Sequence, residues 1–240
     1  MNVFVSPHFD DAVGSCGCLI SSLCSSGQDA EVLTVFAGQH GCTVSGFAKW
    51  MIDSWHLQNG VTERIKENDN ACRILGAQAR NLDFPEALYR KDRTWLYPDG
   101  RALFGTVHEN DLHLTKEISE VIAGLYSNDT VFYFPGALGG HVDHMVVKRA
   151  GEILAAKGCK VFLYEDFSYS GKIQSSLPLR RERRFFTSGD IEKKILAVRA
   201  YTSQLEMLFQ TSDPSDYFYK TNRTESGMIS EVYYEILNTH

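Results

Sequence analysis

The sequence has 240 residues, of which 43% are hydrophobic, 12% aromatic and 22% charged. This composition is typical of a folded globular protein and excludes a disordered or fibrous chain. The formal net charge of -6 and the pI near 5.7 argue against a general affinity for nucleic acid or for an anionic membrane, because both would require a basic face.

The first residues show neither the basic nor the long apolar region of a signal peptide, and no stretch approaches the ~20 apolar residues of a membrane span. We therefore expect a cytoplasmic protein with no membrane insertion. Six cysteines lack the paired C-x-x-C spacing of a structural zinc site or redox motif. We interpret the closest pair, Cys16 and Cys18, as small apolar-like residues that pack inside a helix.

The chain opens with a short β-branched and aromatic run over 3–5, which predicts a buried strand that ends at Ser6-Pro7. Apolar residues then fall at helical spacing over 13–24, and Ser25-Ser26-Gly27 ends the predicted helix. A second strand is predicted over 31–36. This strand, helix and strand make a βαβ unit, which implies a parallel sheet.

Further elements follow in chain order. They are a helix over 63–75 ended by Gly76, a strand over 81–84 stopped by Pro85, a helix over 111–126 that begins with Asp111 as its cap, a strand over 130–134, a helix that continues to about 157, a strand over 161–164 and a helix over 191–208. Two long irregular stretches, 37–59 and 86–110, are expected to form walls of a substrate pocket. The simplest account is a single α/β domain over 1–240, a Rossmann-like three-layer sandwich with a mostly parallel sheet.

Two polar clusters directly follow predicted strands. His8-Phe9-Asp10-Asp11 follows the first strand, and His141-Val142-Asp143-His144 follows the strand over 130–134. Because the carboxyl ends of parallel strands meet at one edge of a sheet, we expect the two clusters to lie close together. A catalytic zinc needs three protein ligands and one open position for water, and these clusters can supply two histidines and a carboxylate. Adjacent aspartates would allow one to bind the metal while the other takes a proton from the water.

Each cluster alone has a simpler interpretation. An H-x-D-D turn is more often a helix cap or a solvated loop, since aspartate favours helix N-termini. For the H-x-D-H turn the two interpretations are about equally good. The conjunction of both clusters, each after a buried strand, favours a metal site. Such a site also accepts iron, cobalt or nickel, so zinc is an inference.

At these residues the chain resembles a known family. Ser6-Pro7-His8-Phe9-Asp10-Asp11 resembles the P-H-x-D-D signature of the LmbE-like/PIG-L de-N-acetylases, and Gly139-Gly140-His141-Val142-Asp143-His144 resembles their H-x-D-H signature. The resemblance touches most of residues 1–166 through a helix pattern of Arg64, Glu67, Ala71, Leu75 and Gly76. Beyond that point only Lys194, Ser203 and Gln204 are similar to the family's C-terminal helix.

The resemblance implies an LmbE-like fold and a role for each residue of the motifs. His8, Asp11 and His144 would bind one Zn²⁺ per chain, and Asp10 would be the general base. His141 would stabilise the oxyanion or protonate the leaving amine, Asp143 would orient a histidine, and Arg64 would contact the substrate. The chain departs from the family pattern at Ala12, where Glu is usual, at Phe9, where Pro is commoner, and at Tyr201, where His is frequent.

The function that the resemblance implies is a zinc-dependent N-deacetylase. It would be a hydrolase that removes an N-acetyl group from an amino sugar such as N-acetylglucosamine, or from a glycoconjugate or natural-product metabolite. Two alternatives stay open: a zinc hydrolase of another amide or a carbamoyl bond, and a non-catalytic homologue that binds a sugar-like ligand. The expected partner is a small N-acyl sugar-like substrate, and a homo-oligomer is left open.

Other conspicuous residues favour simpler roles. We expect His40, His56, His108 and His113 to lie in loops or on polar faces, and the arginines at 180, 181, 183 and 184 to form a solvated face. The aromatic set Trp50, Trp55, Tyr89, Trp95 and Tyr97 is interpreted as loop packing in preference to sugar stacking. The glycines near Gly14 do not complete a G-x-G-x-x-G motif, so no dinucleotide cofactor is inferred.

Overall fold

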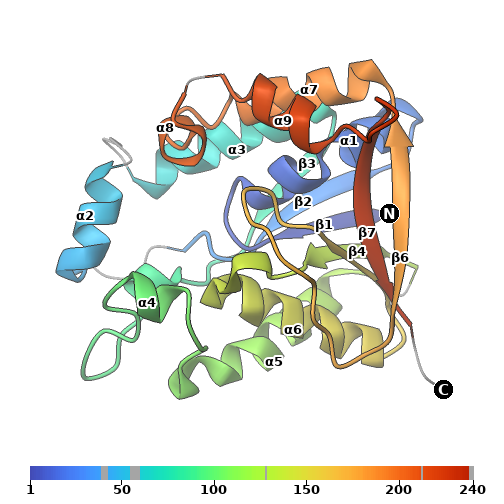
Figure 1. Ribbon diagram of the computed structural model, residues 1–240. Helices are drawn as coiled ribbons and strands as arrows, with labels where there is room; N and C mark the ends of the chain where they lie inside the picture. The colour runs from blue at the N-terminus through green and yellow to red at the C-terminus, as the bar shows by residue number, and fades with distance from the viewer. Residues whose placement is uncertain (39–42, 55–59, 128, 212, 238–240) are drawn as a thin grey trace.

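The computed structural model describes residues 1–38, 43–54, 60–127, 129–211 and 213–237. Within these residues seven strands form one sheet in the order β3-β2-β1-β4-β5-β7-β6 (Figure 1). Their bounds are β1 Asn2–Ser6, β2 Ala30–Thr34, β3 Gln78–Asn81, β4 Val131–Pro135, β5 Lys160–Tyr164, β6 Leu179–Phe186 and β7 Ile229–Ile236. The strands β3, β2, β1, β4 and β5 pair in parallel, whereas β7 pairs antiparallel with both β5 and β6. The expectation of an α/β fold with a mostly parallel sheet is confirmed.

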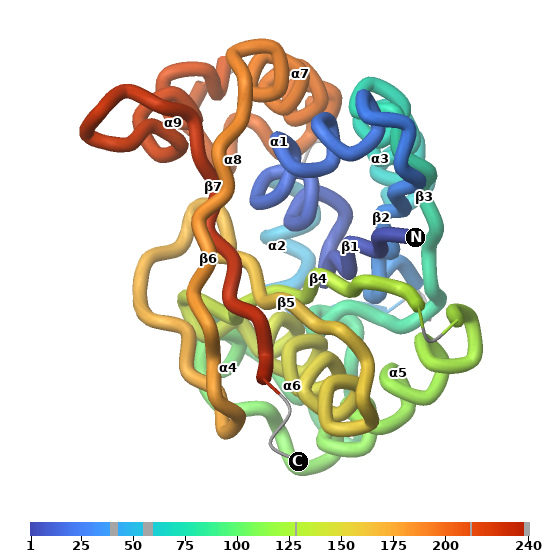
Figure 2. The backbone as a smooth tube through the Cα atoms, turned by 90° about the vertical axis from the view of Figure 1, so that its right-hand side faces the viewer, coloured from blue at the N-terminus to red at the C-terminus, as the bar shows by residue number. Residues whose placement is uncertain are grey.

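Helices cover both faces of the sheet. Their bounds are α1 Asp11–Ser25, α2 Gly46–Ser54, α3 Val61–Leu75, α4 Gly100–Leu103, α5 Leu112–Leu125, α6 Val142–Ala156, α7 Ser188–Val198, α8 Leu205–Phe209 and α9 Ser215–Thr221. Short 3₁₀ turns are η1 Ala87–Tyr89, η2 Glu109–Asp111 and η3 Leu138–Gly140. Figure 2 shows α1, α3 and α7 on one face of the sheet and α5 and α6 on the other. The arrangement is the three-layer sandwich of a doubly wound fold.

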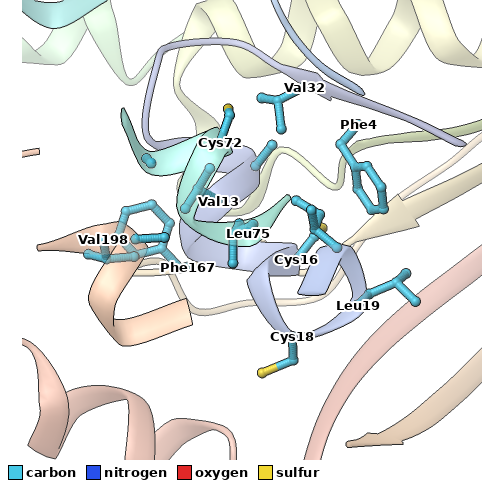
Figure 3. Packing of buried hydrophobic residues seen from close by; sticks show 14 of the residues in the cluster. Phe4, Val13, Cys16, Cys18, Leu19, Val32, Cys72, Leu75, Phe167 and Val198 are labelled. Carbon is cyan, nitrogen blue, oxygen red and sulfur yellow. The ribbon is translucent and has the colours of Figure 1, made fainter. Parts of the chain in front are cut away.

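The strands alternate between two hydrophobic cores, one under each helical layer. Phe4 of β1 packs on the side of α1 and α7, whereas its neighbours Val3 and Val5 pack on the side of α5 and α6. This alternation follows from the two-residue period of a strand. Cys16, Cys18 and Cys72 belong to the first core, as does Phe4 (Figure 3), so the interpretation of Cys16 and Cys18 as packing residues is confirmed.

The sheet topology fixes where a ligand site can form. From β1 the chain goes to β2 and then to β3 on one side, and it returns to β4 on the other side of β1. The connections after β1 and β4 therefore leave the sheet toward opposite faces, which opens a crevice at their carboxyl ends. The loop with His8 follows β1 and the segment with His141 follows β4, so both polar clusters border this crevice.

Two predicted elements are wrong in their positions. The strand expected over 81–84 is β3 at Gln78–Asn81, because Gly76 ends α3 in the left-handed conformation and the chain pairs with β2 almost at once. The helix expected over 191–208 is broken into α7 and α8. Thr187 starts α7 early through a capping box with Asp190, and Glu67 holds the intervening loop by accepting hydrogen bonds from the amide and hydroxyl of Ser203.

Asp111 stands at the N-cap position of α5, as expected, but the prediction that its side chain caps the helix is wrong. Its side chain makes no capping hydrogen bond to α5. Instead the carboxylate lies 2.8 Å from Nε of Arg90 and accepts a hydrogen bond from the hydroxyl of Tyr97 at 2.7 Å. The ion pair with the buried guanidinium of Arg90 stabilises the fold more than a helix cap would, since an unpaired buried charge costs more free energy than an uncapped helix end.

The arginine-rich run expected as a solvated face forms the edge strand β6, in which side chains alternate between exposed and half-buried. None of the helices in the described part of the chain has the length and apolar character of a membrane span.

Candidate active site

The turn after β1 is fixed by hydrogen bonds of Ser6. Its hydroxyl donates to the carbonyl of His8 at 2.5 Å and accepts from the amide of Ala12 at 2.9 Å. The side chains of Phe9 and Ala12 are fully buried, so both departures from the family pattern serve as packing. The hydroxyl of Tyr201, the third departure, lies 2.9 Å from the carbonyl of Phe9 and supports the same turn from the α7 side.

The structure brings His8, Asp11 and His144 together. Oδ2 of Asp11 lies 3.2 Å from Nδ1 of His8 and 3.3 Å from Nε2 of His144. The three candidate ligand atoms lie within 4.8 Å of one another, close enough for one ion to contact all of them. Asp11 occupies the first turn of α1, His144 the first turn of α6 and His8 the turn between β1 and α1, so segments far apart in the sequence supply this group.

The outer nitrogen of each histidine is held by a carboxylate. Nε2 of His8 lies 3.0 Å from Oδ2 of Asp143, and Nδ1 of His144 lies 2.7 Å from Oδ1 of Asp166. This carboxylate–histidine arrangement is the usual support of metal-binding imidazoles, because it fixes the ring and makes the opposite nitrogen a better ligand. The inward atoms are therefore Nδ1 of His8 and Nε2 of His144.

A second group with metal-ligand chemistry consists of His8, His141 and Asp143. The carboxylate of Asp143 is fully buried and already saturated. One oxygen accepts from the guanidinium of Arg90 at 2.5 Å, and the other accepts from the amide of Ala87 at 3.0 Å in addition to its contact with His8. Its charge is neutralised by Arg90, so the first group fits a cation better.

Electrostatics mark the first group as a place for positive charge. Burial lowers the pKa of His144, but Asp11 and Asp166 outweigh this effect and raise it to about 9. Burial also opposes protonation of His8, yet Asp11 and Asp143 raise its pKa well above the ordinary value. Burial raises the pKa of Asp11, and the two imidazoles lower it well below the usual range. A divalent cation would take the place of these protons.

Asp10 lies beside the metal-ligand group with its charge only partly compensated. Burial and the neighbouring Asp11 raise the pKa of Asp10 to about 6, and Arg64 offsets part of the increase. The guanidinium of Arg64 lies 3.7 Å from Oδ1 of Asp10 and 2.8 Å from Oε1 of Glu86, and it stands over the ring of Phe9. Arg64 is itself 4% exposed, so it acts as a buried counter-ion here.

His141 caps α6 and stands beside the same group. Its Nδ1 accepts a hydrogen bond from the amide of Asp143 at 3.2 Å, which leaves the proton of the neutral ring on Nε2. Burial and the charge of His8 lower the pKa of His141 well below the ordinary value, so the neutral form is favoured. The ring centroid lies 4.9 Å from that of His8 and 5.2 Å from that of Phe104.

These residues open into a cavity of about 180 Å³. Its lining includes His8, Asp10, Asp11, Arg64, His141 and Asp143. Met51 and Leu103, from the two irregular stretches, and Gln204, from the family-like C-terminal segment, also line it. The structure thus gathers every predicted site residue at one place, with His144 just beneath the lining.

Sequence reasoning missed Asp166, Arg90 and Glu86. Asp166 lies just after β5, so the rule that site residues follow parallel strands could have found it. Arg90 and Glu86 lie in the irregular stretch after β3, where no periodic pattern distinguishes them from solvated charges. Their burial, at 6% and 5% exposure, is visible only in the fold.

The other conspicuous residues that the structure describes are not part of the cavity lining. Tyr89 and Tyr97 are buried, as expected for loop packing, whereas Trp50 is 65% exposed. Lys91 stands over the ring of Trp95. His108 accepts a hydrogen bond from the amide of Asn110, and His113 is exposed. The predictions for His40, His56 and Trp55 fall outside the described residues.

Comparison with known proteins gives two curated relatives. Both are named 2'-N-acetylparomamine deacetylase. The one from Niallia circulans is 32% identical over 184 residues, a match that covers 70% of this chain and 66% of the relative. The one from Streptomyces fradiae is 30% identical over 223 residues, which cover 85% of this chain and 73% of the relative. The match thus spans about two thirds of the first relative's length.

Among solved structures, a deacetylase–bog complex from the biosynthesis pathway of teicoplanin superposes with a TM-score of 0.89. It is 25% identical, and the match covers 99% of this chain and 98% of that one. The family model described as PIG-L, GlcNAc-PI de-N-acetylase, matches residues 3–155, which contain both histidine-aspartate clusters. The chain therefore belongs to the PIG-L family of de-N-acetylases.

Proposed function

We propose that this protein is an N-deacetylase that hydrolyses the N-acetyl group of an amino sugar or a sugar-containing natural product. The observation that carries the proposal is the convergence of His8, Asp11 and His144 at the base of a cavity, with Asp10 and His141 beside them. The relatives named for the deacetylation of an amino-sugar compound support the same reaction.

A single Zn²⁺ fits the donor set of His8, Asp11 and His144. Two neutral imidazoles and one carboxylate are a common ligand set for catalytic zinc, and the cavity leaves room for a further ligand. When bound, such a cation activates water as a nucleophile and polarises a carbonyl group. Asp143 and Asp166 hold the two imidazoles so that Nδ1 of His8 and Nε2 of His144 face one point.

Asp10 is proposed as the general base. Its carboxylate lines the cavity next to the ligand Asp11, and its raised pKa of about 6 makes it a stronger base than an ordinary aspartate. It would take one proton from the attacking water as the new C–O bond forms at the amide carbon. The guanidinium of Arg64 stabilises the negative charge of Asp10, so that the carboxylate of Asp10 is ionised at neutral pH.

His141 is proposed to stabilise the oxyanion. The neutral ring carries its proton on Nε2, so it can donate to the oxygen that becomes negative in the tetrahedral intermediate. The Nδ1 hydrogen bond from the helix amide of Asp143 fixes this tautomer before the substrate arrives.

Collapse of the intermediate breaks the C–N bond. The proton that Asp10 accepted would pass to the leaving nitrogen, which gives a neutral amine, acetic acid and the regenerated base. The acid then loses its own proton to the amine, so that acetate and a protonated amine are the final products. One water is consumed and no other reactant is needed. Of the two irregular stretches, the described residues Met51, Leu88, Leu103 and Phe104 would form pocket walls around an N-acetylglucosamine-like sugar, and Arg64 would contact it from the cavity floor.

Acetate release from N-acetylated amino sugars tests the proposal. The protein is stripped with a chelator and then titrated with Zn²⁺. We expect acetate release to be lost on stripping and to return at one equivalent. A panel with N-carbamoyl and peptide amides separates this activity from that of another amide hydrolase. Preferred cleavage of those amides, or metal binding with no hydrolysis of any member, would contradict the proposed function.

A further inference from the structure

The cavity is too small to enclose a large substrate. Its volume is about 180 Å³, whereas pockets that enclose a drug-sized ligand measure roughly 300–1,000 Å³. The reacting acyl group and its sugar would occupy this space. Any substituent of that sugar must then lie against the outer wall, so the chemistry of this wall selects the substituent.

Most of the lining beyond the metal-ligand group is apolar and comes from separate segments of the chain, and its polar residues Ser168 and Gln204 are uncharged. We call it the apolar rim and define it by Met51, Leu88, Leu103, Phe104, Met207 and Leu208. The helices α2, α4 and α8, which carry or adjoin most of these residues, lie on the same side of the molecule (Figure 1). Phe104 and Met207 are 47% and 44% exposed, so their side chains are available to a ligand.

The apolar rim is continuous with the candidate active site. The ring of Phe104 stands edge-on to the ring of His141, with centroids 5.2 Å apart. The ring centroid of Phe104 also lies 6.2 Å from that of Tyr169, another residue of the cavity lining. A group bound against Phe104 would therefore be attached close to the reacting amide.

Carboxylates that could bind an ammonium group are missing from the outer part of this wall, as far as the described residues show it. The acidic lining residues Asp10, Asp11, Glu86 and Asp143 are each 7% exposed or less. Each of them already faces a guanidinium or an imidazole: Glu86 pairs with Arg64, and Asp143 pairs with Arg90. A substrate with several ammonium groups would lose their hydration at the rim without gaining ion pairs.

From these observations we propose that the substrate carries an uncharged, apolar substituent beside its N-acyl amino sugar, and that this substituent binds on the apolar rim. The inference rests on the proposed deacetylase function and narrows its substrate class to apolar glycosides of an amino sugar. Burial of the apolar surface of the substituent would supply binding energy and would raise kcat/KM.

The test uses matched glycosides of N-acetylglucosamine with methyl, phenyl and 2-aminoethyl aglycones, each as both anomers. Acetate release by the Zn²⁺-loaded protein is measured as kcat/KM. We expect the phenyl glycoside to exceed the methyl glycoside about tenfold for at least one anomer, and the 2-aminoethyl glycoside to gain nothing over methyl.

Variants of the rim then locate the effect. Met207→Ser should shrink the phenyl-to-methyl ratio, and Met207→Asp should raise the 2-aminoethyl-to-methyl ratio by placing a carboxylate on the rim. Met207 is half exposed, so both variants should fold. Phe185→Ser is the matched control, because Phe185 is 55% exposed on the edge strand β6, outside the cavity lining, and should leave all ratios unchanged.

The outcomes separate the two proposals. Hydrolysis of all three glycosides with equal kcat/KM, or a preference for the 2-aminoethyl glycoside, would overturn the inference and leave the deacetylase function standing. A phenyl preference that survives both Met207 variants would also overturn the role of the rim. Release of acetate from none of the three would contradict the proposed function itself.

Discussion

Nδ1 of His144 lies 2.7 Å from Oδ1 of Asp166, and both side chains are 1% exposed. The second oxygen of Asp166 accepts from the amide of Leu138, so the carboxylate cannot rotate away. It fixes the ring of His144 with Nε2 turned toward Asp11. We predict that Asp166→Asn weakens Zn²⁺ affinity about 10–100-fold, as loss of such supporting carboxylates usually does. Competition with a calibrated chelator would measure the change.

The neighbouring Glu165 offers a matched control. Its carboxylate accepts a hydrogen bond from the exposed hydroxyl of Tyr234, away from the histidines. Glu165→Gln should therefore leave Zn²⁺ affinity unchanged. An Asp166→Asn protein that binds Zn²⁺ as tightly as the parent would show that the contact with His144 does not support a metal ligand.

Asp10 and His144 both lie at the metal-ligand group, yet we predict different effects of their substitution on the metal. Asp10→Asn should retain one Zn²⁺ per chain and lose about 10²–10⁴-fold in kcat, because only the base is removed. His144→Ala should lose both metal and turnover. Metal analysis of the purified variants together with acetate release distinguishes the two. An active Asp10→Asn protein would remove the proposed role of this carboxylate.

The pH profile should carry the signature of Asp10. The base works only when ionised, and its pKa is raised to about 6, so kcat/KM should fall as the pH falls through this value. A bound divalent cation lowers the pKa of a nearby carboxylate, which places the inflection at or below about 6. The metal content at each pH is the control, since loss of metal would also reduce activity. An acidic limb centred above pH 7, at constant metal content, would contradict this assignment.

The parallel half of the fold could be predicted from the sequence because its signals are local. The buried run before Ser6-Pro7 and the helical spacing after it define β1 and α1 within a few residues. The two polar clusters could likewise be placed together, since each follows a parallel strand. The antiparallel strands β6 and β7 could not be predicted, because they are separated by three helices and pair only through the completed sheet.

The charged residues that support the site could not be predicted from the sequence for the same reason. Arg90 pairs with Asp143 and with Asp111, which lie 53 and 21 positions later in the chain. A single arginine in an irregular stretch gives no sign of such partners. Asp111 shows how such a partner defeats a local prediction. Aspartate is a common capping residue and Asp111 does stand at the start of α5, but its carboxylate pairs with Arg90 instead of capping the helix.

The ion pair of Lys194 and Glu231 supports the helix that carries Asp11. Nζ of Lys194 lies 2.8 Å from Oε1 of Glu231, and both side chains are almost fully buried. The same carboxylate accepts the amides of Cys18 and Leu19 within α1. A Cβ atom on Gly17 would lie 2.5 Å from Cγ of Lys194, so the glycine permits this close approach.

We predict that Lys194→Met lowers the free energy of unfolding by about 3–5 kcal/mol, because it leaves the charge of Glu231 buried without a cation. Urea unfolding of the parent and the variant would measure the loss. Lys193→Met is the control: this adjacent lysine is exposed and donates a hydrogen bond to the hydroxyl of Ser25, so its removal should cost less than about 1 kcal/mol. Adding Glu231→Gln to Lys194→Met should recover part of the loss, since the neutral amide still accepts from α1 but carries no buried charge. A double variant no more stable than Lys194→Met alone would assign the cost to lost packing of the lysine stem instead of to the stranded carboxylate.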